Sequence, residues 1–170
     1  MGAEDFVRAV PDCPEKGETY YDFSRLLTDR EGFDTAMAGL MEMFDREVFD
    51  AILCTSSYGG MLGAAVAQKL GRTIIPVRDE GSVPGPCETF PVEGKDWGVQ
   101  VPEGSIRKGM KLILMADVLA TGRTTKAIIG LAERSGAEVI RIGYIAELSK
   151  YGARKSKSLR GYPFESLTIY

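Results

Sequence analysis

One stretch, residues 111–136, constrains the fold more than any other part of the chain. It opens with four consecutive apolar residues, 112–115, which are typical of a buried strand. Small and polar residues follow from Ala116 to Gly122, and apolar residues then return with helical spacing. The pattern predicts a strand, a tight loop and a helix, which is the repeating unit of α/β proteins.

The loop of this unit is also the first candidate for a binding site. In an open α/β sheet, ligands lie at the carboxyl ends of the strands, and a helix N-terminus offers N–H groups to a phosphate. Asp117 beside such a loop would suit ribose hydroxyls or a hydrated Mg²⁺. The same residues also fit a plain strand-to-helix turn with Thr124 as the N-cap. Neither Gly-x4-Gly-Lys-Thr nor Gly-x-Gly-x-x-Gly is present, which argues against nucleotide triphosphatases and dinucleotide enzymes.

The rest of the chain repeats this alternation of strand and helix. Helices are expected at 4–10, from 33 to about 45–47, and at 61–70, and strands at 51–54, 73–77, 139–148 and 164–170. This order predicts an α/β fold with a mainly parallel twisted sheet and helices on both faces. Residues 1–170 are expected to form one domain, with an N-terminal arm at 1–32 and a flap or hairpin at 86–108.

Composition excludes several functions. With 44% hydrophobic and 26% charged residues, the chain is typical of a soluble protein, and its net charge of −3 does not favour nucleic acid. It shows no leader or bilayer-length apolar run, so we expect a cytoplasmic protein with no membrane partner. Three widely spaced cysteines fit neither a disulfide framework nor a zinc site. Histidine is absent, which removes Ser-His-Asp and Cys-His catalysis.

Three further clusters have both a functional and a plain interpretation. The loop 55–60 could hold a second phosphate of the same ligand, aided by Arg78, or could be only a turn beside a surface arginine. The aromatic residues at 20, 21 and 23 fit core or dimer contacts, and also a platform for a ligand base. The basic residues Arg154, Lys155, Lys157 and Arg160 are interpreted as a solvated loop rather than a nucleic-acid site.

Residues 115–124, Met-Ala-Asp-Val-Leu-Ala-Thr-Gly-Arg-Thr, resemble a hallmark of the adenine phosphoribosyltransferases, which are type I phosphoribosyltransferases. That hallmark is usually Val-Asp-Asp-Leu-Leu-Ala-Thr-Gly-Gly-Thr. The opening segment 11–27 resembles the family's Pro-Asp-Phe-Pro to Thr-Pro-Leu-Leu segment. Later landmarks at Pro76-Val77-Arg78, Glu147-Leu148 and Gly161-Tyr162-Pro163 follow in the family's order. The resemblance therefore covers nearly the whole chain.

The resemblance implies transfer of a phosphoribosyl group from phosphoribosyl pyrophosphate (PRPP) to a purine base, most simply adenine. AMP and pyrophosphate would form, with Mg²⁺ carried by PRPP rather than by a dedicated protein site. It also implies a homodimer and a flap near 88–94 that closes over the substrates. Asp117 and Glu93 would be catalytic, and the substrate would be bound by Ala120, Thr121, Gly122, Arg123, Thr124, Thr125, Ser57, Tyr58, Gly59, Arg78 and Tyr21.

Several positions depart from the family pattern. Ala116 replaces the first acid of the pair, Arg123 replaces a loop glycine, and Asp79 replaces a lysine. The loop usually written Glu-Ser-Arg-Gly is here Ser-Ser-Tyr-Gly at 56–59, and an arginine of the opening segment is Tyr21. Two alternatives therefore stay open beside an active transferase: a catalytically impaired relative that binds AMP or PRPP as a sensor, and a phosphate-loop domain that serves in an assembly.

Overall fold

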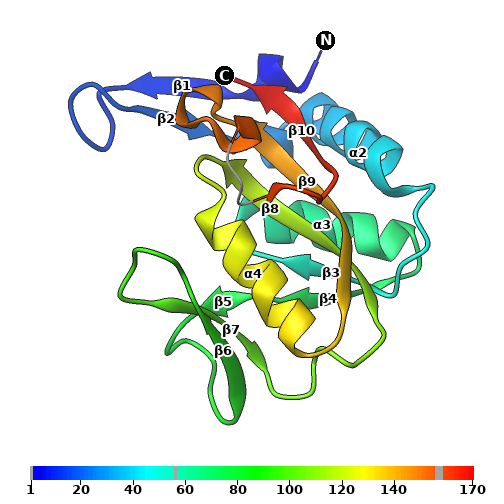
Figure 1. Cartoon of the computed structure of the whole chain (residues 1–170). Coiled ribbons are helices and arrows are strands. Elements are labelled where there is room, and N and C mark those ends of the chain that lie inside the picture. The colour runs from blue at the N-terminus through cyan, green and yellow to red at the C-terminus, as the bar shows by residue number, and fades with distance from the viewer. Residues whose placement is uncertain (1, 56, 156–158) are drawn as a thin grey trace.

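A five-stranded parallel sheet forms the centre of the computed structural model, which describes residues 2–55, 57–155 and 159–170 (Figure 1). Its strand order is β10-β9-β8-β3-β4, and every neighbouring pair is parallel. The strands are β3 (Ala51–Cys54), β4 (Thr73–Pro76), β8 (Lys111–Leu119), β9 (Glu138–Glu147) and β10 (Phe164–Ile169). The expected parallel sheet is confirmed, and β8 lies at its centre.

Helices cover both faces of this sheet, as expected. Side chains alternate along β8: Leu112 and Leu114 pack in the core beneath α4, whereas Ile113 and Met115 pack in the core beneath α2 and α3. The helices are α1 (Arg25–Thr28), α2 (Arg30–Phe44), α3 (Tyr58–Lys69) and α4 (Arg123–Arg134). Burial on both faces explains why the strand sequence is a continuous apolar run.

The N-terminal arm differs from the expectation. The helix expected at 4–10 is wrong: a single 3-10 turn, η1 (Ala3–Phe6), is followed by β1 (Arg8–Pro11), which pairs antiparallel with β2 (Thr19–Asp22). Pro11 disfavours helical geometry in the residue before it, and strand pairing satisfies the backbone instead. The arm therefore carries a hairpin, which lies beside β10 and the two chain ends in Figure 1.

The expected flap is a three-stranded antiparallel sheet beside α4. Its strands are β5 (Arg78–Asp79), β6 (Cys87–Pro91) and β7 (Gly98–Pro102). The Phe90 ring packs against Gly130 of α4, where an added Cβ would lie 2.5 Å from the ring. Arg134 donates to the Thr89 carbonyl at 2.8 Å, and its guanidinium lies 5.3 Å from the Phe90 ring centroid. The base of the flap is therefore anchored on α4.

The chain between β9 and β10 forms two short 3-10 turns, η2 (Ser149–Tyr151) and η3 (Ala153–Lys155). Arg154 forms an ion pair of 2.7 Å with Glu147, whose side chain is 3% exposed. Arg154 is exposed, as expected for a solvated loop, and it also neutralises a buried carboxylate, which the sequence did not indicate. Lys157, in the same expected basic cluster, lies outside the described residues.

Candidate active site

Asp117, near the end of β8, contacts the segment that follows β3. Strand β8 continues to Leu119, two residues beyond Asp117, so the strand break expected at 116–117 is wrong. The Asp117 carboxylate accepts hydrogen bonds from the Ser57 hydroxyl and the Gly59 N–H, and from the Thr55 hydroxyl at 3.4 Å. Because β3 and β8 are parallel neighbours, their carboxyl ends bring the two candidate loops together.

Gly59 makes this approach possible. An added Cβ there would lie 2.7 Å from both the Ala116 carbonyl carbon and Asp117 Oδ1, so any other residue would displace backbone atoms. Gly59 lies in the first turn of α3, whose free N–H groups carry a partial positive charge toward the carboxylate. Ser56, which belongs to the same expected loop, lies outside the described residues.

The loop from Ala120 leads into α4 as expected, with one correction. The N-cap is Gly122, at φ +77°, so the alternative that gave this role to Thr124 is wrong. Thr121 and Thr124 are exposed, which leaves their hydroxyls open to a ligand, whereas Thr125 is buried. A glycine adopts this left-handed conformation without strain, and the first N–H groups of the helix have no partner within it.

Thr125 is held by a contact that the sequence did not reveal. Its hydroxyl lies 2.7 Å from the hydroxyl of Tyr144, which is fully buried in β9. Burial raises the pKa of Tyr144 above its usual range, so the phenol stays protonated and can donate. The contact fixes the first turn of α4 on the sheet.

We expect Tyr144→Phe to lower the free energy of unfolding by about 1–3 kcal/mol, because a buried hydroxyl on Thr125 loses its partner. Urea denaturation would measure the change. Tyr151→Phe, at a side chain that is 45% exposed, is the matched control and should change stability by less than about 0.5 kcal/mol. Equal effects of the two substitutions would contradict a structural role for this bond.

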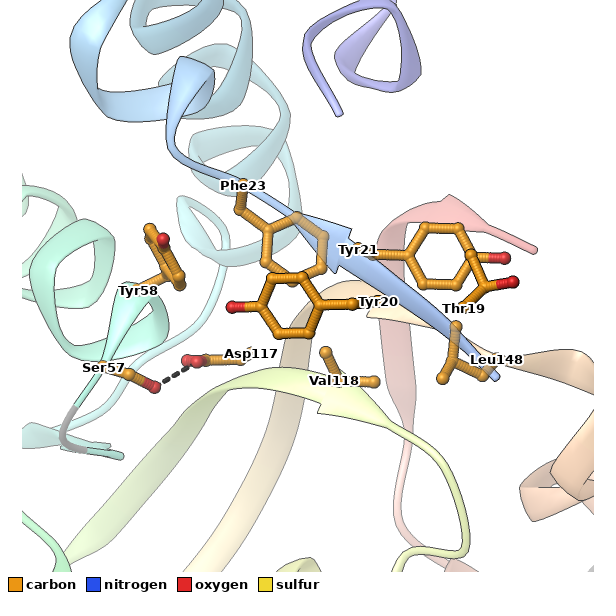
Figure 2. A pocket seen from close by; sticks show the side chains of 9 residues that line it. All are labelled: Thr19, Tyr20, Tyr21, Phe23, Ser57, Tyr58, Asp117, Val118 and Leu148. Atoms are coloured by element: carbon orange, nitrogen blue, oxygen red, sulfur yellow. Dashed lines mark hydrogen bonds between the residues drawn. The ribbon is translucent and has the colours of Figure 1, made fainter. Parts of the chain in front are cut away.

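Two cavities meet at Asp117. We call the first the aromatic cavity, of about 240 Å³, which is shown in Figure 2 and lined by Thr19, Tyr20, Tyr21, Phe23, Ser57, Tyr58, Asp117, Val118 and Leu148. We call the second the loop cavity, of about 330 Å³, which is lined by Thr55, Ser57, Ala116, Asp117, Val118, Thr124, Thr125 and Ile128. Asp117, Ser57 and Val118 belong to both. The site therefore joins a compartment walled by aromatic rings to one that includes the first turn of a helix.

The aromatic cavity is built by the N-terminal arm. Tyr21 stacks on Tyr170 with ring centroids 4.2 Å apart, and Phe23 meets Tyr58 edge-on at 5.8 Å. In Figure 2 the ring of Tyr20 lies beside Phe23 and above Asp117 and Val118. These rings provide the flat apolar walls that a heterocyclic base requires.

The structure places the other candidate residues elsewhere. Glu93, on the flap, forms an ion pair of 3.2 Å with Lys126 of α4, and together with Arg123 it lines a third cavity of about 250 Å³. Arg78 is exposed on β5. Glu93 is therefore held beside α4 and does not line either of the two cavities at Asp117.

Ser24 is a site residue to which the sequence interpretation gave no role. Its hydroxyl lies 3.1 Å from that of Tyr58, and its N–H donates to Asp22 at 2.9 Å. An aspartate that accepts a bond from the backbone two residues later is a recognisable turn signal, so the Asp-x-Ser spacing could have revealed the bond between Asp22 and Ser24, although not the contact with Tyr58.

Two features do not occur in the part of the chain that the structure describes. No group of three or more cysteine or acidic side chains is arranged to hold a metal ion among these residues. Within the same residues, no helix has the length and apolar character needed to cross a membrane.

The parallel sheet, the flap and the loop beside Asp117 define a type I phosphoribosyltransferase fold. An adenine phosphoribosyltransferase of Thermotoga sp. (strain RQ2) is 37% identical over 173 residues, covering 100% of both chains. The solved adenine phosphoribosyltransferase of Thermoanaerobacter pseudethanolicus superposes with a TM-score of 0.89 at 28% identity, covering 99% of this chain and 98% of that one. The solved enzyme of Giardia lamblia, complexed with 9-deazaadenine, superposes with a TM-score of 0.88 at 25% identity. The match covers 100% of this chain and 98% of that one.

The chain belongs to the adenine phosphoribosyltransferase family and is a phosphoribosyltransferase, an enzyme of the pentosyltransferase class. No family model matches it.

Proposed function

We propose that this protein transfers the phosphoribosyl group of PRPP to a purine base, adenine, and forms AMP and pyrophosphate. One observation carries the proposal: a single carboxylate, Asp117, lies between a cavity walled by aromatic rings and a cavity that includes a helix N-terminus. A base in the first and a phosphorylated ribose in the second would meet at Asp117. The Giardia lamblia relative, which binds 9-deazaadenine, supports a purine as the base.

In this proposal the loop cavity takes the ribose 5′-phosphate. The first turn of α4 offers free N–H groups and its positive dipole end, and the exposed hydroxyls of Thr121 and Thr124 can donate to phosphate oxygens. Ala120, Gly122 and Arg123 complete the loop. The buried side chain of Thr125 is occupied by Tyr144, so Thr125 would contribute its backbone N–H.

Asp117 would bind the ribose hydroxyls and stabilise positive charge at the reacting carbon. The bond from that carbon to pyrophosphate breaks as a bond to a ring nitrogen of the base forms. The electron pair leaves with pyrophosphate, and the proton of that ring nitrogen passes to a pyrophosphate oxygen. Because an oxocarbenium-like transition state needs positioning and charge stabilisation more than a strong base, a chain without histidine can support it. Glu93 would reach Asp117 only if its ion pair with Lys126 breaks and the flap moves away from α4.

The substrate would be the Mg²⁺ complex of PRPP. Mg²⁺ is commonly bound by substrate phosphates with one or two carboxylates, and Asp117 supplies one carboxylate at the junction of the two cavities. Ser57 and Gly59, which approach Asp117 from α3, would lie on the pyrophosphate side, and Arg78 would add positive charge there. The homodimer and the cytoplasmic location stay predictions.

A pyrophosphate-release assay with PRPP, Mg²⁺ and a panel of bases tests the proposal. We expect release that depends on adenine, and stabilisation of the fold by AMP and by PRPP in thermal-shift experiments, because both ligands bind only the folded state. If no base gives turnover while AMP still binds, the proposed transferase activity is wrong, and the alternative of a catalytically impaired AMP sensor is favoured. Neither the comparisons nor the described residues support that sensor.

A further inference from the structure

A chain of three polar groups leads from the N-terminal arm into the aromatic cavity. It begins at Asp22, which accepts bonds from both the N–H and the hydroxyl of Ser24 and pairs with Arg8 at 2.9 Å. The bonds from Ser24 lower the pKa of Asp22, so its carboxylate is ionised at neutral pH. An ionised carboxylate can only accept. The hydroxyl proton of Ser24 therefore points toward Asp22.

This fixes the direction of the next bond. The hydroxyl oxygens of Ser24 and Tyr58 are 3.1 Å apart, and either could donate in principle. A serine hydroxyl has one proton, and that of Ser24 is already given to Asp22, so Ser24 must accept from Tyr58. The proton of Tyr58 is thereby directed away, and its oxygen is left with lone pairs alone for any further partner.

The ring of Tyr58 is also held in place. Phe23 meets it edge-on at 5.8 Å, and Tyr58 lines the aromatic cavity with Tyr20 and Phe23 (Figure 2). Ser57 likewise gives its proton to Asp117, so three polar groups of this cavity, Tyr58, Ser57 and Asp117, are committed as acceptors. The side of the cavity formed by these three groups therefore favours a ligand that presents N–H donors, whereas the Tyr20 hydroxyl, which also lines the cavity, keeps a proton to donate.

We infer that Tyr58 is a specificity-determining residue that selects a 6-aminopurine over a 6-oxopurine. Its oxygen would accept a hydrogen bond from the exocyclic amino group of the base, whereas a carbonyl oxygen in that place would face lone pairs and lose its hydrogen bond to water. The inference rests on the proposed function and assigns Tyr58 to the base rather than to pyrophosphate. A mispaired buried polar group costs enough to give about 10-fold to 100-fold discrimination.

Equilibrium binding of adenine and of hypoxanthine by calorimetry, with PRPP affinity measured separately, tests the inference on the full chain. The wild-type protein should bind adenine at least about tenfold more tightly. Tyr58→Phe keeps the ring but removes the acceptor, so most of that preference should disappear while PRPP affinity is unchanged. Ser24→Ala frees the Tyr58 proton to turn toward the base, so hypoxanthine binding should improve. Tyr151→Phe, on an exposed turn, should change neither ratio.

Three results would overturn the inference: an unchanged adenine preference in Tyr58→Phe, a loss of PRPP affinity in that variant at a constant base ratio, or no binding of either base to the wild type. Failure of the proposed transfer reaction gives a different result. If the protein binds adenine selectively through Tyr58 but releases no pyrophosphate, the role of Tyr58 in base selection is supported and the proposed transfer reaction is wrong.

Discussion

Replacing Asp117 with asparagine should lower kcat/KM for PRPP by about 100-fold to 1000-fold, the usual loss when one preorganised group at a developing charge is removed. The substitution removes the single negative charge between the two cavities. It also disturbs the loop, because an amide has one acceptor atom where the carboxylate has two. Either the Ser57 hydroxyl or the Gly59 N–H would then face an NH₂ group.

Steady-state pyrophosphate release at saturating adenine measures this effect, and Asp34→Asn is the matched control. Asp34 is an exposed carboxylate on α2 whose contact is an ion pair of 2.8 Å with Arg30 on the same helix. That control should keep activity within about twofold, since exposed pairs contribute little. If Asp117→Asn loses no more activity than Asp34→Asn, the proposed role of Asp117 in transfer is wrong.

The central strand and its loop were predictable because their signals are local. Four apolar residues before Asp117 and helical spacing after Gly122 fixed the order of strand, loop and helix, and parallel packing then required the loops after β3 and β8 to meet. The turn at Gly71, which ends α3 with φ +64°, was predictable for the same reason.

The contacts that shape the site were less predictable because they join distant segments. The Ser24 and Tyr58 hydroxyls are 34 residues apart in sequence, and Thr125 and Tyr144 are 19 apart. Nothing in the local pattern of either pair indicates its partner. The helix expected at 4–10 was wrongly predicted for a related reason. Pairing with β2 determines the conformation of residues 8–11 and overrides their local helical preference.

The position of the flap shows a third kind of limit. A hairpin at 86–108 could be predicted from turn residues and from the alternation of apolar and polar residues. Its packing position in the fold could not. Phe90 fits over Gly130 only because that helical residue lacks a side chain, and the ion pair between Glu93 and Lys126 holds the flap tip at the same helix. The sequence thus predicted a flap near the site without showing that α4 would anchor it.

Replacing Arg154 with alanine should give the largest loss of stability. Glu147, at the end of β9, is 2% exposed, and the Nε atom of Arg154 donates to both of its carboxylate oxygens at 2.9 Å. The guanidinium also lies 4.8 Å from the Phe164 ring centroid. Removing one partner leaves an ionised carboxylate between β8 and β10, because Glu147 is paired with Leu119 and Ile169 in the sheet.

Breaking a buried ion pair typically costs about 3–5 kcal/mol, and we expect a value near 3 kcal/mol because Arg154 itself is half exposed. For a chain of this length that corresponds to a fall in Tm of about 6–12 °C. Arg30→Ala, which breaks an exposed helical pair, should cost only about 0.3–0.5 kcal/mol.

A second substitution separates loss of charge balance from loss of packing. If the unpaired carboxylate causes the destabilisation, adding Glu147→Gln to Arg154→Ala should recover part of the lost stability, because an amide costs less to bury than an ionised carboxylate. If instead the lost contact with Phe164 dominates, the double substitution should be no more stable than Arg154→Ala alone. A Tm for Arg154→Ala equal to that of Arg30→Ala would show that water compensates Glu147 fully, and would contradict a structural role for this pair.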